Sequence, residues 1–294
     1  MINYNLQIAG YNIRIESDQD GPDLVPEERF HKNIIRSADY DVLIRVHPGH
    51  YIIPEEAERL FVAPYIIEVK DMKITSRDNF WSVYRYRSSL FICTNFPADK
   101  NKTAVLKFSL LMREWDLWID GAGNSFDPLE YPLDGLILYY LTVINGDIMI
   151  HAAGVNIAGQ GFLFSGISGK GKTTIATIFG DSGARIIHDD RLIIRNINSD
   201  YYMFNTPVRR DDSPDKSHLH RIFLIEHAQV NKISPLSGAK AVTNVIANCI
   251  QHNYSSDMIA RFLGSVSILC SAIPVATLQF KPDRSVIDHL LEYV

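Results

Sequence analysis

The stretch "GISGKGKTT", residues 166–174, carries residue types that bind phosphate groups. It fits the pattern G-x-x-x-x-G-K-[ST], in which a glycine-rich backbone precedes a lysine and a hydroxyl. Glycine accepts the backbone angles that aim several N–H groups at one anion. We expect the amine of Lys172 to reach the β- and γ-phosphates of ATP and the hydroxyl of Thr173 to bind Mg²⁺.

The segments on either side of this loop are predicted to form a strand and a helix that would hold it in place. The apolar run "GFLF", residues 161–164, predicts a strand before it, and "KTTIATIFGDSG", residues 172–183, predicts a helix after it. The positive N-terminal end of that helix adds to anion binding. The predicted nucleotide-binding residues are Gly166, Ser168, Gly169, Lys170, Gly171, Lys172, Thr173 and Thr174.

Two acidic residues follow at the end of a second apolar segment, "ARIIHDD" at 184–190. One carboxylate can hold Mg²⁺, and the other can take the proton of an attacking hydroxyl. Adjacent residues of a regular strand point to opposite sides, so Asp189 and Asp190 can act together only if the strand ends there. The alternative is that one of them caps or turns the chain.

Several other polar residues could have a catalytic or binding role, but each also has a structural explanation. His151 lies on a predicted strand ahead of the loop, where a lone histidine is more often a packed group. Arg209 and Arg210 follow a predicted hairpin and can either neutralise a transferring phosphoryl group or form a solvated turn. His218 and His220 lack an evident third metal ligand, which favours a surface loop.

Composition limits the classes of function. The chain has 294 residues, 46% of them hydrophobic and 21% charged, and a net charge of −5. These values are typical of a globular protein, and the negative charge disfavours nucleic acid as a partner. Three scattered cysteines predict free thiols in a reducing cytosol. No apolar signal segment and no run of about 18 apolar residues is found, so we expect a cytoplasmic protein without a membrane span.

The pattern along the chain predicts two parts. Residues 1–125 alternate between polar and apolar types and predict a β-rich N-terminal lobe of unknown role. Residues 126–294 mix strands and helices around the strand, loop and helix just described, which predicts an α/β P-loop nucleotide-binding domain. A GTPase is disfavoured because "NKIS", residues 231–234, has Ser234 where guanine recognition needs an acid.

The segment "HAAGVNIAGQGFLFSGISGKGKTTIATIFGDSGARIIHDD", residues 151–190, resembles the catalytic domain of HPr kinase/phosphorylase. The ATP-dependent phosphoenolpyruvate carboxykinases share that nucleotide fold and a similar loop. The resemblance covers about 148–195, with weaker similarity beyond. It implies that His151 acts near the γ-phosphate or the metal, that Asp189 is the general base and that Asp190 is the metal partner.

The departures from that family bear on the substrate. The glycine-rich signature that follows the aspartates in HPr kinases is not recognisable here, and Thr174 stands where those kinases usually have an acid. HPr and phosphorolysis are therefore disfavoured. A carboxykinase is disfavoured as well, because no basic cluster for a carboxylic substrate is recognised before His151.

The sequence as a whole predicts an ATP-dependent kinase that transfers the γ-phosphoryl group to a hydroxyl. The acceptor would be a serine of a peptide or protein, or a small molecule. The predicted catalytic residues are Asp189, His151, Lys172 and Arg209, with ATP and Mg²⁺ as ligands and Thr173 and Asp190 at the metal. A non-catalytic ATP-binding accessory or sensor protein and a partner-stimulated ATPase are the alternatives. The oligomeric state stays open, a homo-oligomer included.

Overall fold

The computed structural model describes residues 2–17, 23–37, 39–69, 72–97, 99–121, 123, 125–207, 213–252 and 254–294. Contacts divide the chain into two compact units, Met1–Tyr140 and Leu141–Val294, each described by itself below. The helix α1 (Leu133–Asn145) runs through this division, which lies beyond the boundary expected after residue 125. In the described residues, no helix is both long and apolar enough to span a bilayer.

The first unit is built on a nine-stranded sheet with the order β4-β1-β2-β5-β10-β9-β8-β7-β6. Its strands are β1 (Ile2–Ile8), β2 (Tyr11–Ser17), β4 (Ile34–Ile35), β5 (Val42–Pro48), β6 (Glu58–Val69), β7 (Met72–Tyr86), β8 (Ser89–Phe96), β9 (Asp99–Phe108) and β10 (Glu114–Asp120). The pairs β2–β5 and β5–β10 are parallel, and the other pairs are antiparallel. Buried and half-exposed residues alternate along β2, because every second side chain points to the same face.

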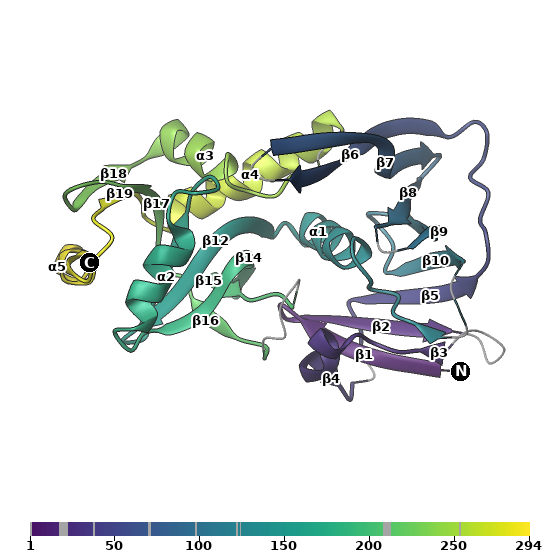
Figure 1. The fold of residues 1–294 in the computed structure, drawn as a ribbon, viewed down its shortest axis with the longest axis horizontal. Coiled ribbons are helices and arrows are strands. Elements are labelled where there is room, and N and C mark those ends of the chain that lie inside the picture. Colours follow the sequence, from purple (N-terminus) through teal and green to yellow (C-terminus); the bar gives the residue numbers. More distant parts are fainter. Residues whose placement is uncertain are drawn as a thin grey trace. The chain divides into compact units, whose positions relative to one another are not determined.

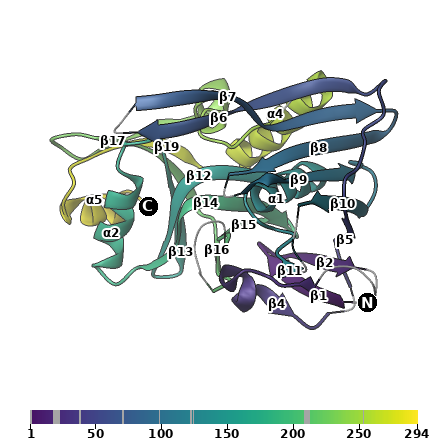
Figure 2. The same ribbon diagram turned by 45° about the vertical axis from the view of Figure 1, so that its right-hand side comes forward.

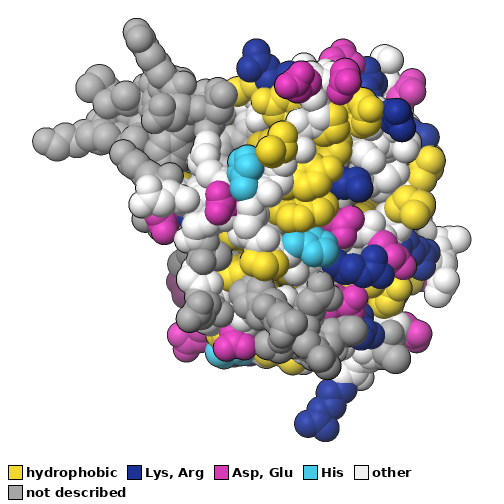
Figure 3. Space-filling view, turned by 90° about the vertical axis from the view of Figure 1, so that its right-hand side faces the viewer, with side chains coloured by type: hydrophobic (Ala, Val, Ile, Leu, Met, Phe, Trp, Pro, Cys, Tyr) yellow, Lys and Arg dark blue, Asp and Glu magenta, His cyan; other side chains and the backbone are white. Residues whose placement is uncertain are grey.

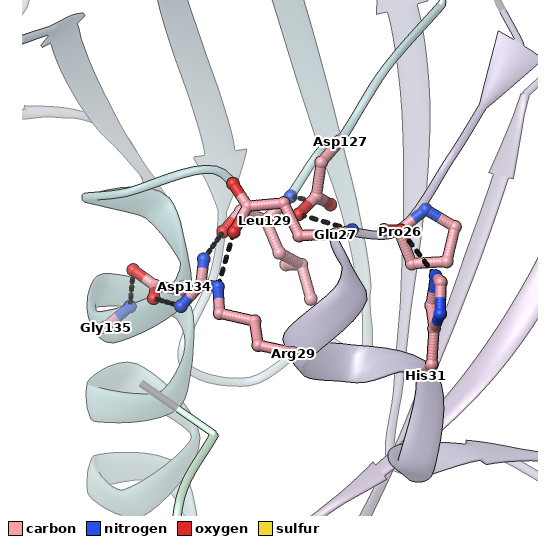
Figure 4. Close-up of polar contacts among 8 residues, drawn as sticks. All are labelled: Pro26, Glu27, Arg29, His31, Asp127, Leu129, Asp134 and Gly135. Atoms are coloured by element: carbon pink, nitrogen blue, oxygen red, sulfur yellow. Dashed lines mark hydrogen bonds and ion pairs between the residues drawn. The ribbon is translucent and has the colours of Figure 1, made fainter. Parts of the chain in front are cut away.

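A short second pairing and a buried polar cluster complete this unit. The strands β3 (Asp23–Leu24) and β11 (Ser125–Phe126) pair in parallel, and a 3-10 helix spans Glu28–Asn33. Asp127 is buried and accepts backbone N–H groups from Leu129 at 2.9 Å and Glu27 at 3.3 Å (Figure 4). Burial raises the pKa of Asp127 to about 6 in spite of these two hydrogen bonds.

Arg29 also links the segment around Glu27 with the segment from Leu129 to Asp134 (Figure 4). Its guanidinium donates to Asp134 at 2.5 Å, to Glu27 at 2.5 Å and to the carbonyl of Leu129 at 3.2 Å. The side chain of Asp134 is only 1% exposed. The carboxylate of Asp134 therefore depends on Arg29 for its compensating charge.

We expect Arg29→Ala to lower the free energy of unfolding by about 3–5 kcal/mol, because it leaves the buried carboxylate of Asp134 without its counter-charge. Arg85→Ala is the matched control, since Arg85 pairs with Glu58 at an exposed position and should cost no more than about 1 kcal/mol. Urea denaturation of the two variants measures the difference. Equal losses of stability would contradict the proposed dependence of Asp134 on Arg29.

Charged side chains of both signs are interspersed with hydrophobic ones on the face shown in Figure 3. In the first unit, for example, Arg45 lies 2.7 Å from Glu114 and 3.4 Å from Glu16. The absence of nucleic acid among the partners stays a prediction from net charge.

The second unit holds an eight-stranded sheet with the order β16-β15-β14-β12-β13-β17-β19-β18. Its strands are β12 (Ile148–Ile157), β13 (Gln160–Ser165), β14 (Arg185–Ile197), β15 (Asp200–Phe204), β16 (Lys216–His218), β17 (Arg221–His227), β18 (Lys232–Leu236) and β19 (Val275–Phe280). The neighbours β13, β17 and β19 are mutually parallel, and the remaining pairs are antiparallel.

Helices cover both faces of this sheet (Figures 1 and 2). The helices α2 (Lys172–Gly180) and α5 (Ser285–Tyr293) contribute Ile175, Phe179 and Leu290 to one hydrophobic cluster. The helices α3 (Gly238–Ile246) and α4 (Ser256–Ala272) contribute Val245 and Leu269 to the cluster on the other face. The unit is therefore a mixed α/β layer structure, as the sequence pattern predicts.

The strand that carries the two acids differs from the prediction. The sequence interpretation ends this strand at Asp190, but β14 continues to Ile197 because the apolar segment 192–194 stays buried in the sheet. The register of β12 and β14 shifts between Gly154 and Val155, opposite the residues just before Asp189. This irregularity precedes the two acids, which pair regularly with Ala153 and Ala152, and yet both carboxylates line one cavity without a strand end.

Candidate phosphate-binding site

The predicted loop lies at one edge of the second unit's sheet. The strand β13 ends at Ser165, residues 166–171 form the connection, and α2 begins at Lys172. The carboxyl ends of the parallel strands β13, β17 and β19 meet at this edge, where α/β proteins commonly bind ligands. The N-terminal end of α2 opens toward the same place and favours an anion.

Two glycines give the loop its left-handed backbone, and one of them, Gly171, also allows close packing on its neighbours. Gly169 and Gly171 have φ values of 82° and 96°, in the left-handed region. A Cβ atom on Gly171 would lie 2.5 Å from Nε2 of His227 and 2.9 Å from Cζ of Phe280. A side chain at position 171 would therefore push the loop away from the ends of β17 and β19.

A cavity of about 340 Å³ lies beside this loop. Its walls are formed by His151, Ser168, Gly169, Gly171, Lys172, Thr173, Thr174, Asp189, Asp190 and His227. The structure thus brings together most of the residues singled out from the sequence, although they come from β12, β14, the loop and α2. His227 is the member that sequence reasoning missed.

Lys172 is buried at the base of this cavity, with its amine turned toward the loop. Its Nζ donates to the carbonyl of Gly166 at 2.7 Å and approaches that of Ile167 at 3.4 Å. Burial lowers the pKa of Lys172, while the charges of Asp189 and Asp190 act in the opposite direction. An ammonium group has three N–H donors, so these contacts leave capacity for a further acceptor such as a phosphate oxygen.

His151 and Asp190 form a pair on the neighbouring strands. Nδ1 of His151 lies 3.0 Å from Oδ1 of Asp190, and both side chains are partly exposed. Burial tends to raise the pKa of Asp190, but the hydrogen bond from His151 and the charge of Arg191 outweigh it, so the pKa is lowered. The backbone of His151 is fixed as well, since its N–H donates to Asn248 and its carbonyl accepts from Ser165.

Asp189 lies next to Asp190 on β14, opposite Ala153 of β12. It lines the cavity, and its negative charge acts on the pKa of Lys172. The cavity therefore has one carboxylate in contact with an imidazole and a second one facing the same space.

Two predicted site residues, Lys170 and Gly166, do not line this cavity. Lys170 directs its amine to Glu226 at 2.7 Å, and both residues line a neighbouring cavity of about 450 Å³ behind the loop. Gly166 lines that second cavity too and offers its carbonyl to Lys172. Arg209 lies outside the described residues, so its predicted role stays a prediction.

The residues predicted to hold Mg²⁺, Thr173 and Asp190, both line the first cavity. A hydroxyl and a carboxylate are oxygen donors of the type that Mg²⁺ accepts, and waters and substrate phosphates usually supply its other ligands. Within the described part of the chain, no three or more His, Cys, Asp or Glu side chains are grouped to hold a metal ion. Thr173 and Asp190 supply two oxygen donors, which fits a Mg²⁺ ion that takes its other ligands from water and phosphate.

The comparisons with known proteins add a distant structural similarity. No family model matches the sequence, and no curated protein matches it. Among solved structures, the Hpr(Ser) kinase/phosphatase from Coxiella burnetii matches 49% of this chain and 97% of its own, with 12% sequence identity and a TM-score of 0.28. The assignment of the site rests on the geometry described above.

Proposed function

We propose that this protein is an ATP-dependent phosphotransferase that moves the γ-phosphoryl group of ATP to a hydroxyl. The observation that carries this proposal is a single cavity at the N-terminal end of α2 that combines a lysine, two threonine hydroxyls, two aspartates and two histidines. Each of these groups has a part in phosphoryl transfer, where catalysis consists mainly of positioning and charge neutralisation.

The roles follow from position. Backbone N–H groups of the loop and of the first turn of α2 bind the phosphates, and the amine of Lys172, which also donates to Gly166, binds the β- and γ-phosphates. Thr173 and Asp190 hold Mg²⁺, whose charge offsets that of the phosphate oxygens. His151 keeps the carboxylate of Asp190 in place.

The transfer step uses Asp189. The acceptor oxygen forms a bond to the γ-phosphorus while the bond from that phosphorus to the β,γ-bridging oxygen breaks, and ADP leaves. The carboxylate of Asp189 takes the proton of the acceptor hydroxyl. The acceptor is a serine of a peptide or protein, or a small alcohol.

A second candidate is an ATP-binding sensor without transfer, or an ATPase that a partner stimulates. The contacts of Lys172 with the loop carbonyls favour it, because they occupy part of the donor capacity of the amine that a phosphate would use. This candidate predicts nucleotide binding without a labelled acceptor. Phosphate release that increases when a partner is added would indicate the ATPase.

An assay with γ-labelled ATP and Mg²⁺ tests the proposed function. The acceptors are serine-containing peptides, small alcohols and a cell extract, and α-labelled ATP serves as the control for simple binding. We expect label to move to an acceptor only from the γ-position and only with Mg²⁺ present. ATP binding without transfer to any acceptor would favour the sensor, and absence of ATP binding would exclude the proposal.

A further inference from the structure

The cavity beside the loop has two chemically different ends. His151, Asp189 and Asp190 lie on β12 and β14, which are on one side of β13 in the sheet. His227 lies on β17, which is on the other side of β13. If the acids mark the transferring γ-phosphoryl group, as the proposed function requires, the side of the cavity next to β17 is open to the rest of the nucleotide.

His227 is well placed to meet that part of the nucleotide. It is the last residue of β17 and is exposed, and its ring packs on Phe280 with 4.8 Å between ring centroids. Its Nε2 edge faces Gly171, the residue immediately before α2. Among the described residues, this ring packs on Phe280, and its nitrogens make no hydrogen bond.

The packing fixes which edge of the ring reaches the site. The contact with Phe280 uses the ring face, so the nitrogen edge is directed at the loop where the N–H groups of α2 begin. A phosphate group held at that helix end would have the Nε2 edge of His227 beside it, because the imidazole and the first residues of α2 line the same cavity. A hydrogen bond between an imidazole and a charged oxygen is stronger than one between neutral groups.

We infer that His227 is a nucleotide-contacting residue that donates a hydrogen bond from Nε2 to the phosphates that remain in ADP. This inference rests on the proposed function, since the acids define which end of the cavity holds the γ-phosphoryl group. It identifies β17 as the side on which the nucleoside diphosphate portion binds. His151 and His227 then contact opposite ends of one polyphosphate.

Two substitutions separate hydrogen bonding from packing. His227→Gln keeps an N–H donor near the position of Nε2 but loses the ring, whereas His227→Phe keeps a ring on Phe280 but loses the donor. We expect the Phe variant to bind ADP with Mg²⁺ about 10- to 100-fold more weakly than the natural protein, the range for loss of a hydrogen bond to a charged group. We expect the Gln variant to stay within about threefold of the natural protein.

Isothermal titration with ADP, and with pyrophosphate as a probe that lacks the nucleoside, provides the measurement. The natural protein and the two variants should rank in the same order of affinity for pyrophosphate as for ADP, because the contact of His227 is to phosphate. If the Phe variant binds normally and the Gln variant does not, His227 stacks on the base and the inference is wrong. If both variants bind weakly and also unfold at a lower temperature without ligand, His227 acts through packing and the inference is again wrong.

The same titrations distinguish this inference from the proposed function. If the natural protein binds ADP and Lys172→Ala does not, while His227→Phe binds as the natural protein does, only the inference about His227 fails. If the natural protein binds neither ADP nor ATP, both fail. In the transfer assay, His227→Phe should raise the KM for ATP and leave kcat within a few-fold, because the ring contacts the phosphates that are not transferred.

Discussion

Lys172→Ala is expected to reduce phosphoryl transfer by at least about 10²–10³-fold and to weaken ATP binding by about 10- to 100-fold. Lys172 lines the cavity next to Thr173 and Thr174, and its amine donates to the carbonyl of Gly166 in the loop. Alanine removes the charge that offsets the developing charge on the phosphate oxygens. Titration with ATP and the γ-label transfer assay measure the two effects separately.

Two other lysines make this experiment specific. Lys240 is an exposed residue of α3, and Lys240→Ala should leave both binding and transfer unchanged. Lys170 stands in the loop itself, but its amine contacts Glu226 and lines the neighbouring cavity. Lys170→Ala should therefore reduce ATP binding and phosphoryl transfer by no more than a few-fold. An equal loss in Lys170→Ala and Lys172→Ala would contradict the specific assignment of Lys172 and would mean that both lysines of the loop are needed.

Asp189→Asn should leave ATP binding within a few-fold and reduce transfer by about 10²–10⁴-fold, the usual contribution of a general base. The amide has nearly the shape of the carboxylate but cannot accept the proton of the acceptor hydroxyl. Rapid-quench single-turnover measurements at saturating ATP isolate the transfer step from binding and release. Full turnover in Asp189→Asn would show that the base is a different group.

Asp190→Asn provides the comparison because it alters the neighbouring carboxylate. Asp190 contacts His151 and is assigned to the metal, so its substitution should weaken binding of the Mg²⁺–ATP complex as well as transfer. Raising the Mg²⁺ concentration should restore part of the loss in Asp190→Asn and none in Asp189→Asn. Identical behaviour of the two variants would indicate that the acids share one role.

Much of the second unit could be predicted from the sequence because its signals are local. The glycine pattern of 166–174, the apolar strand before it and the helix after it depend on residues close together in the chain, and the structure forms β13, the loop and α2 at those places. The hairpin between β14 and β15 follows for the same reason, with Asn198 and Ser199 at positive φ. Helices α3, α4 and α5 follow from apolar periodicity.

The sequence by itself therefore determined which residues have the chemistry for phosphate binding and which elements carry them. The tertiary structure decided what these residues face. It continued β14 beyond Asp190, turned Lys170 toward Glu226 and placed β17 next to β13, which brought His227 to the cavity. Strand pairing and the direction of a side chain depend on contacts between residues distant in the chain. The apolar periodicity within one segment does not contain information on these contacts.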